Sequence, residues 1–68
     1  MTFDEVWKQV KGLSDVIMVQ VPSVLSESTK KRLCKRRPEK IKVIVDQAIE
    51  EVNHGSIEPL DTLIKRRL

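Results

Sequence analysis

The sequence has few aromatic residues, few glycines and almost no cysteine. Tyrosine is absent, and Phe3 and Trp7 are the only aromatic residues among 68. The single Cys34 excludes an internal disulfide and is typical of a protein in a reducing cytoplasm. Only two glycines and three prolines occur, so the chain has no flexible linker, no low-complexity tract and no glycine-rich phosphate loop.

Residue types that carry catalysis or bind metal ions are also scarce. His54 is the only histidine, and it lacks the partners of a metal site at ligand spacing. The serines have no nearby base, and Glu50 and Glu51 cannot act on one substrate because adjacent helical positions diverge. We therefore expect a non-enzyme without catalytic residues, metal ions or cofactors.

No stretch of the chain is suited to a membrane. The longest uncharged run, residues 16–26, is shorter than the roughly 20 residues that a transmembrane helix needs. The N-terminus is amphipathic and acidic, unlike a signal peptide. We expect a cytoplasmic protein with no membrane partner. A chain of this length forms one small core, so we also expect a single small helical domain over residues 1–68.

The sequence does contain one strong helical pattern, over residues 38–53. Ile41, Val45 and Ala48 recur at spacings of three and four, which places them on one helical face. A proline suits the first turn and a glycine follows the last turn, as at many helix ends. Apolar residues extend beyond this face, so we expect the helix to be covered from two sides.

Shorter helices are predicted on either side of this central helix. Each opens at a serine or threonine that can cap its first turn. The predicted ranges are about 3–11, 27–36 and 57–67, with caps at Thr2, Ser26 and Ser56. We expect Ile57 on the inner stripe of the last helix, and a short connection that folds this helix back along the central one. The prediction is an all-α fold, a small bundle of about four short helices around a central helix at 38–53. A core this small is marginal alone, so a homodimer is expected.

Residues 16–21 leave two structures open. The run is apolar apart from Gln20, and it can form a short buried helix or a strand. Periodicity does not separate the two in so short a run. A strand would be unpaired in a monomer and would therefore need a symmetric partner.

In the second case the order of segments resembles that of a ribbon–helix–helix repressor. The resemblance is carried by Met18-Val19-Gln20-Val21-Pro22, by Leu25-Ser26-Glu27-Ser28-Thr29-Lys30-Lys31-Arg32-Leu33 and by the run from Pro38-Glu39-Lys40-Ile41. It implies a dimer whose paired strands enter the DNA major groove, with Met18 and Gln20 facing the bases and residues 30–37 on phosphates. A ribbon–helix–helix-like dimer with a short strand at 16–21 is thus the alternative to the helical bundle.

The charges of the chain are segregated. Residues 1–28 carry −2, residues 29–45 carry +7, residues 46–58 carry −4 and residues 59–68 carry +2. If the last helix returns along the central one, its cations join the basic segment. We expect a basic pole that binds nucleic acid and is built from Lys30, Lys31, Arg32, Lys35, Arg36, Arg37, Lys40, Lys42, Lys65, Arg66 and Arg67. An acidic pole around Glu50 and Glu51 should lie opposite.

Two functions follow from this layout. A dense cationic cluster attracts phosphates without sequence preference, which favours a small nucleic-acid-associated regulator. The alternative is a protein–protein adaptor that binds its partner through an apolar groove or through the two opposed charge poles. The same cluster of cations over residues 30–37 would also be found if this segment were only the solvated face of a helix.

Overall fold

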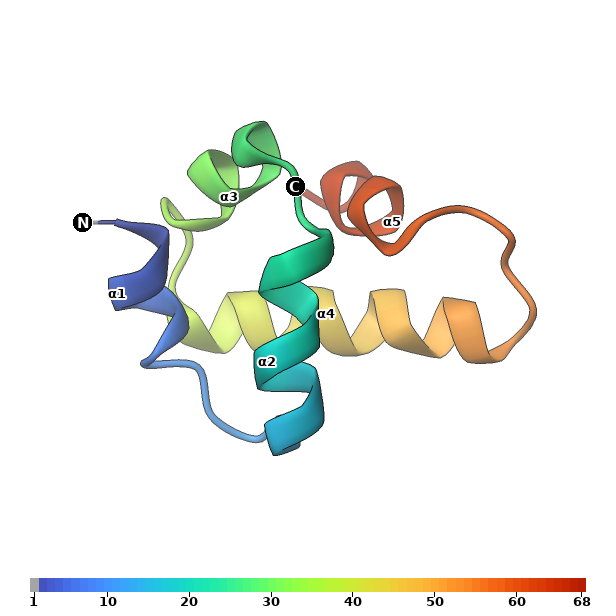
Figure 1. The fold of residues 1–68 in the computed structure, drawn as a ribbon, viewed down its shortest axis with the longest axis horizontal. Helices are drawn as coiled ribbons and strands as arrows, with labels where there is room; N and C mark the ends of the chain where they lie inside the picture. Colours follow the sequence, from blue (N-terminus) through green and yellow to red (C-terminus); the bar gives the residue numbers. More distant parts are fainter. Residues whose placement is uncertain (1) are drawn as a thin grey trace.

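The computed structural model describes residues 2–68. Within them the chain consists of helices joined by irregular segments, without strands (Figure 1). The helices of these residues are α1 (Phe3–Trp7), α2 (Asp15–Val24), α3 (Glu27–Leu33), α4 (Pro38–Asn53) and α5 (Leu60–Arg66). They pack into a globule of 34 × 23 × 19 Å. The predicted all-α fold around a central helix is confirmed.

Helix α4 has the bounds that the sequence predicts. Pro38 occupies the first turn, where its missing N–H costs no hydrogen bond. At the other end Gly55 takes a φ of +96°, which a residue with a side chain rarely adopts. The N–H of Ser56 then donates to the carbonyl of Glu51 at 3.0 Å, and that of Gly55 to Val52 at 3.1 Å. These two bonds form a Schellman motif, which satisfies carbonyls at the end of the helix.

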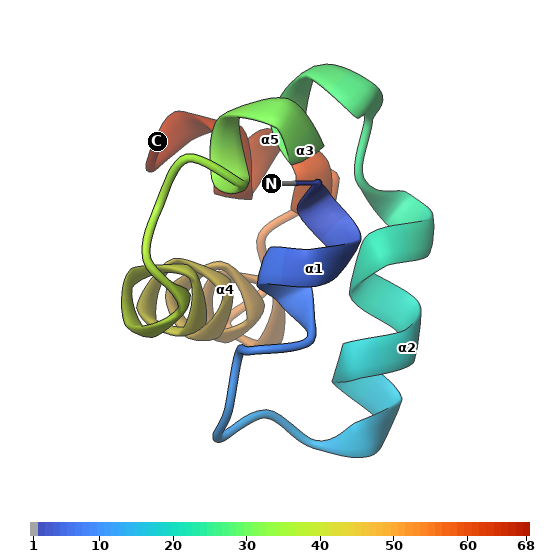
Figure 2. The ribbon, with the colours of Figure 1, turned by 90° about the vertical axis from the view of Figure 1, so that its left-hand side faces the viewer.

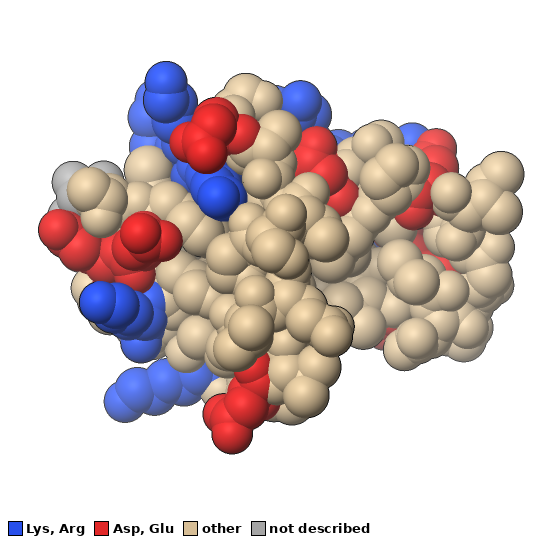
Figure 3. Space-filling model, viewed as in Figure 1, with Lys and Arg blue, Asp and Glu red and all other residues tan. Residues whose placement is uncertain are grey.

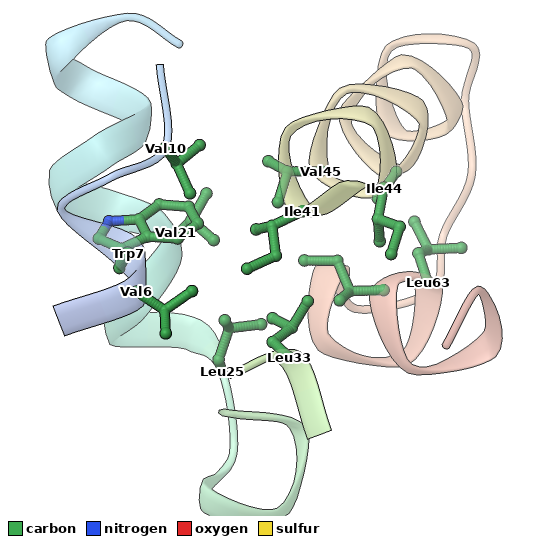
Figure 4. Packing of buried hydrophobic residues seen from close by; sticks show 12 residues of the cluster. Val6, Trp7, Val10, Val21, Leu25, Leu33, Ile41, Ile44, Val45 and Leu63 are labelled. Atoms are coloured by element: carbon green, nitrogen blue, oxygen red, sulfur yellow. The ribbon is translucent and has the colours of Figure 1, made fainter. Parts of the chain in front are cut away.

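The other helices cover α4 from two sides. Viewed along α4, helices α3 and α5 lie above it and helices α1 and α2 lie beside it (Figure 2). One cluster of buried side chains joins them, and all five helices contribute (Figure 4). The members are Val6, Trp7, Val10, Val21, Leu25, Leu33, Ile41, Ile44, Val45, Ala48, Leu63 and Ile64. Cover from two sides was expected because α4 is apolar over more than one face.

Helix α2 settles the ambiguous segment against the strand. Residues 16–21 lie within α2, which continues through Pro22. Proline has no N–H to donate to the carbonyl of Met18, four residues earlier. The indole Nε1–H of the buried Trp7 donates to this carbonyl instead, at 2.9 Å. The alternative strand at 16–21, and with it the ribbon–helix–helix arrangement, is therefore wrong for this chain. A helix uses its backbone N–H and C=O groups within itself, so residues 16–21 offer no free row of them with which the strand of a second copy could pair.

Helices α1 and α3 are shorter than predicted. The N–H of Glu5 donates to the Thr2 hydroxyl at 3.3 Å, so the expected cap of α1 is present. The helix ends at Trp7, and tighter turns with hydrogen bonds between residues three apart carry the chain to the buried Val10. Helix α3 ends at Leu33, and turns with hydrogen bonds from Lys35 to Arg32 and from Arg36 to Leu33 follow it. The residue before Pro38 is extended, as a proline requires of its predecessor.

Helix α5 begins three residues later than predicted. Pro59 disfavours the α conformation at Glu58, the residue before it, so the chain stays extended and the helix opens at Leu60. The connection after α4 is therefore residues 54–59 rather than a short turn. Ile57 lies in this connection and is 98% exposed. The prediction that Ile57 belongs to an inner stripe is wrong.

Candidate nucleic-acid interface

Six of the predicted cationic residues form a group that we call the basic corner. All six are exposed, and none of them forms an ion pair with a carboxylate of residues 2–68. They are Lys31, Arg32, Lys35, Arg36, Arg37 and Lys40. Six positive charges within ten consecutive residues, with Glu39 as the only acid among them, give this segment a strong local field.

The basic corner follows the chain from the last turn of α3, through the connecting loop, into the first turn of α4. This part of the chain lies at the opposite end of the molecule from the connection 54–59 (Figure 1). The positive end of the α4 dipole is also here, and Arg37, the N-cap residue, makes no side-chain hydrogen bond to the first turn. Backbone and side chains thus contribute charge of the same sign.

Lys30 and Lys42 lie on the same two helices but have partners nearby. The ammonium of Lys30 is 3.8 Å from a carboxylate oxygen of Glu27 and lies 5.8 Å from the centre of the Phe3 ring. The ammonium of Lys42 is 2.6 Å from a carboxylate oxygen of Asp46, one turn along α4. Part of their charge is therefore compensated within residues 2–68.

The C-terminal cations do not join the basic corner. Arg66 pairs with Glu58 at 2.6 Å, and the hydrogen bond and charge of this carboxylate raise the pKa of the Arg66 guanidinium. Arg67 lies 3.0 Å from a carboxylate oxygen of Glu51 and donates to the Gln47 side chain at 2.9 Å. Arg67 therefore faces the acidic second half of α4, and Arg66 faces the connection that follows α4. The prediction that they return to the basic start of α4 is wrong.

The reason is the position at which α5 begins. A short turn would have carried α5 back to the beginning of α4, whereas the connection 54–59 leaves the last residues of α5 opposite Gln47 and Glu51. Lys65 lies on the same exposed end of α5 and forms no ion pair with residues 2–68. Together with Lys30 and Lys42, five of the eleven predicted binding residues thus lie outside the basic corner.

A second surface, on α2, is nearly free of charge. Figure 3 shows that uncharged residues occupy the centre of this side of the molecule and that lysines and arginines lie toward its margin. A groove of about 420 Å³ opens between α2, α4 and α5. Its walls are mainly aliphatic: Ile17, Val21, Val24, Ile49, Pro59 and Leu60. The sequence leads to the expectation of an apolar groove in a protein–protein adaptor, but not to its position in the fold. The near-absence of charged residues in α2 was the signal that could have located it.

Other kinds of site find no support in the described part of the chain. Residues 2–68 contain no group of histidine, cysteine and acidic residues that could hold a metal ion. Among the helices of the same residues, none combines the length and apolar character of a membrane span. Comparison with family models, curated proteins and solved structures finds no match to this chain.

Proposed function

We propose that this protein is a small, non-enzymatic, nucleic-acid-associated regulator that binds phosphates through the basic corner. One observation carries the proposal: six exposed cations in the segment 31–40 have no acidic partner among residues 2–68. Cations that only solubilise a surface are commonly interspersed with acids. Elsewhere in this chain that is the case, since Lys42, Arg66 and Arg67 each pair with a carboxylate. The unpaired group is therefore the surface that we assign to phosphates.

The chemistry of this surface suits the nucleic-acid backbone rather than the bases. Arginine offers a planar fork of N–H donors that matches two phosphate oxygens, and lysine offers a point charge. The two aromatic residues of the chain do not lie in the basic corner: Trp7 is buried, and Phe3 stacks on it with ring centres 5.6 Å apart. We therefore propose binding without base stacking and with little preference for sequence.

The test measures binding of random-sequence duplex DNA at about 50 mM and about 200 mM salt. We expect binding at the lower concentration and a steep loss at the higher one, because each neutralised phosphate releases a counterion. The variant Arg36→Gln with Arg37→Gln should weaken binding roughly tenfold or more at low salt and flatten the salt slope by about 2.

The matched control is Arg66→Gln with Arg67→Gln, which removes the same charge from the arginines paired with Glu58 and Glu51. This control should change the affinity by less than about threefold, since the loss of long-range attraction alone is small at this salt concentration. Equal losses in the two double variants would mean that net charge, not the basic corner, attracts DNA.

The second candidate function is a protein–protein adaptor, and the groove beside α2 favours it. An adaptor that binds through the groove would keep its partner at 200 mM salt and would tolerate Arg36→Gln with Arg37→Gln. Failure of the wild-type protein to bind DNA at 50 mM salt would remove the nucleic-acid proposal and leave this candidate in its place.

A further inference from the structure

Helix α2 has the composition of a buried helix but lies on the surface. Asp15 is its only charged residue in ten, and apolar residues occupy every side of it. A helix that is hydrophobic all round is normally enclosed by protein. In this structure Val21 is its only buried residue, while Val16 is 60% exposed and Val19 is 75% exposed.

The exposed valines and the groove together form one apolar face. Val16 and Val19 are exposed along the outer side of α2, with Asp15 and Gln20 beside them. The groove runs along the neighbouring side of the same helix, where Ile17, Val21 and Val24 form one of its walls. The face thus places exposed aliphatic side chains next to an apolar groove.

We infer that this face is the interface of a homodimer in which two copies of the chain pack their α2 helices together. A two-fold axis makes the same patch meet itself, so each patch must offer both the feature that inserts and the feature that receives. Here Val16 and Val19 of one copy can enter the groove of the other, and the two-fold symmetry supplies the same contact in reverse. This inference does not rest on the proposed binding of nucleic acid.

The distribution of charge favours a second copy over a different protein. Two chains of net charge +3 repel each other, and this nearly uncharged face is a side on which they can meet without bringing their basic corners together. A different partner would normally be selected by polar groups aimed at it. The polar residues of the groove are Gln20 and Asp61, and Asp61 already accepts the backbone N–H of Ser26, so the groove offers such a partner few polar groups.

The face is small for a stable dimer. Ten helical residues span about 15 Å, and a helix is about 10 Å across. Even with the groove walls on α4 and α5, the area of this face is less than the roughly 800 Å² that each partner of a stable complex buries. An area of that size would be about a sixth of the 4657 Å² surface of the molecule. We therefore expect a weak dimer, with a dissociation constant of about 10 µM to 1 mM.

Sedimentation equilibrium of the wild-type protein over about 10 µM to about 1 mM tests the inference. We expect the mass to rise from the 7.9 kDa of one chain toward about twice that value. Val19→Glu should stay at the mass of one chain throughout, since it places two charges in the interface. Val43→Glu is the matched control, because Val43 is a 45% exposed helical valine outside the face, and it should dimerise like the wild type.

Dilution of the isotope-labelled wild-type protein, followed by NMR, gives a second test that needs no variant. Amide signals of α2 and of the groove walls should shift with concentration, while those of the basic corner should not. A wild-type protein that remains a monomer at about 1 mM would overturn the inference and leave the groove to another protein. Shifts centred outside α2, or equal effects of Val19→Glu and Val43→Glu, would overturn it as well.

Discussion

The carboxylate of Asp61, at the start of α5, accepts the backbone N–H of Ser26 at 2.9 Å, across 35 positions of the chain. Ser26 is also the N-cap of α3, and its hydroxyl lies 3.0 Å from the Oγ1 of Thr29, which is fully buried. This short network fixes the beginning of α5 against the junction of α2 and α3. The bond from Ser26 is the main reason that the pKa of Asp61 lies below its ordinary value of 3.8.

Asp61→Asn should reduce the dependence of stability on acid pH. Because the folded pKa of Asp61 is lower than the unfolded one, its contribution is complete above about pH 4 and is lost as the pH falls through the folded pKa. We expect the variant to be less stable by about 0.5–1 kcal/mol at pH 7 and to lose less stability on acidification. Urea denaturation between pH 7 and about pH 2 measures both effects.

Asp4→Asn is the control for this experiment. Asp4 is exposed in the first turn of α1, and its carboxylate accepts no hydrogen bond from residues 2–68. This variant should keep the wild-type slope below pH 4. If Asp61→Asn kept that slope too, the bond to Ser26 would contribute nothing to stability.

Trp7→Phe should destabilise the protein by about 1–3 kcal/mol, because the Met18 carbonyl then has no donor in a helix interrupted by Pro22. Pro22→Ala restores the backbone N–H that would normally reach this carbonyl. In the Pro22→Ala background, Trp7→Phe should therefore cost about 1 kcal/mol less. A double-mutant cycle by urea denaturation isolates this difference from the change in ring size. Equal costs in the two backgrounds would show that the indole bond does not replace a helical one.

Ile41→Ala and Ile57→Ala make the same chemical change at opposite extremes of burial. Ile41 is fully buried in the central cluster, and its truncation should cost about 2–5 kcal/mol, which is a large part of the stability of a domain this small. Ile57 is 98% exposed, and its truncation should change stability by less than about 0.5 kcal/mol. Thermal denaturation followed by circular dichroism compares them. Similar melting temperatures would mean that the core is placed wrongly.

The sequence predicts α4 to the residue because the information about this helix is local. Its apolar spacing is sustained over 16 residues, and its proline and glycine act on the backbone next to them. Residues 16–21 could not be assigned in the same way. The helix is supported through Pro22 by the indole N–H of Trp7, which lies eleven residues from Met18 in the sequence. The periodicity of residues 16–21 says nothing about a donor in another segment.

The candidate site shows the same division. The basic corner is contiguous in sequence, so its residues stay together whatever the fold. The C-terminal arginines depend on where α5 begins, and Pro59 moves that point by three residues, from Ile57 to Leu60. In the structure Arg66 therefore pairs with Glu58 and Arg67 with Glu51. A prediction that misplaces the start of α5 by three residues puts them at the basic start of α4 instead.

Trp7 is also an intrinsic fluorescent probe of this protein. The chain has one tryptophan and no tyrosine, so near-ultraviolet fluorescence comes almost entirely from one side chain on α1. In the folded protein the ring is 6% exposed and its N–H is bound to the carbonyl of Met18. Emission at shorter wavelength therefore reports α1 docked on α2, and a shift to longer wavelength reports their separation, without any label added to the chain.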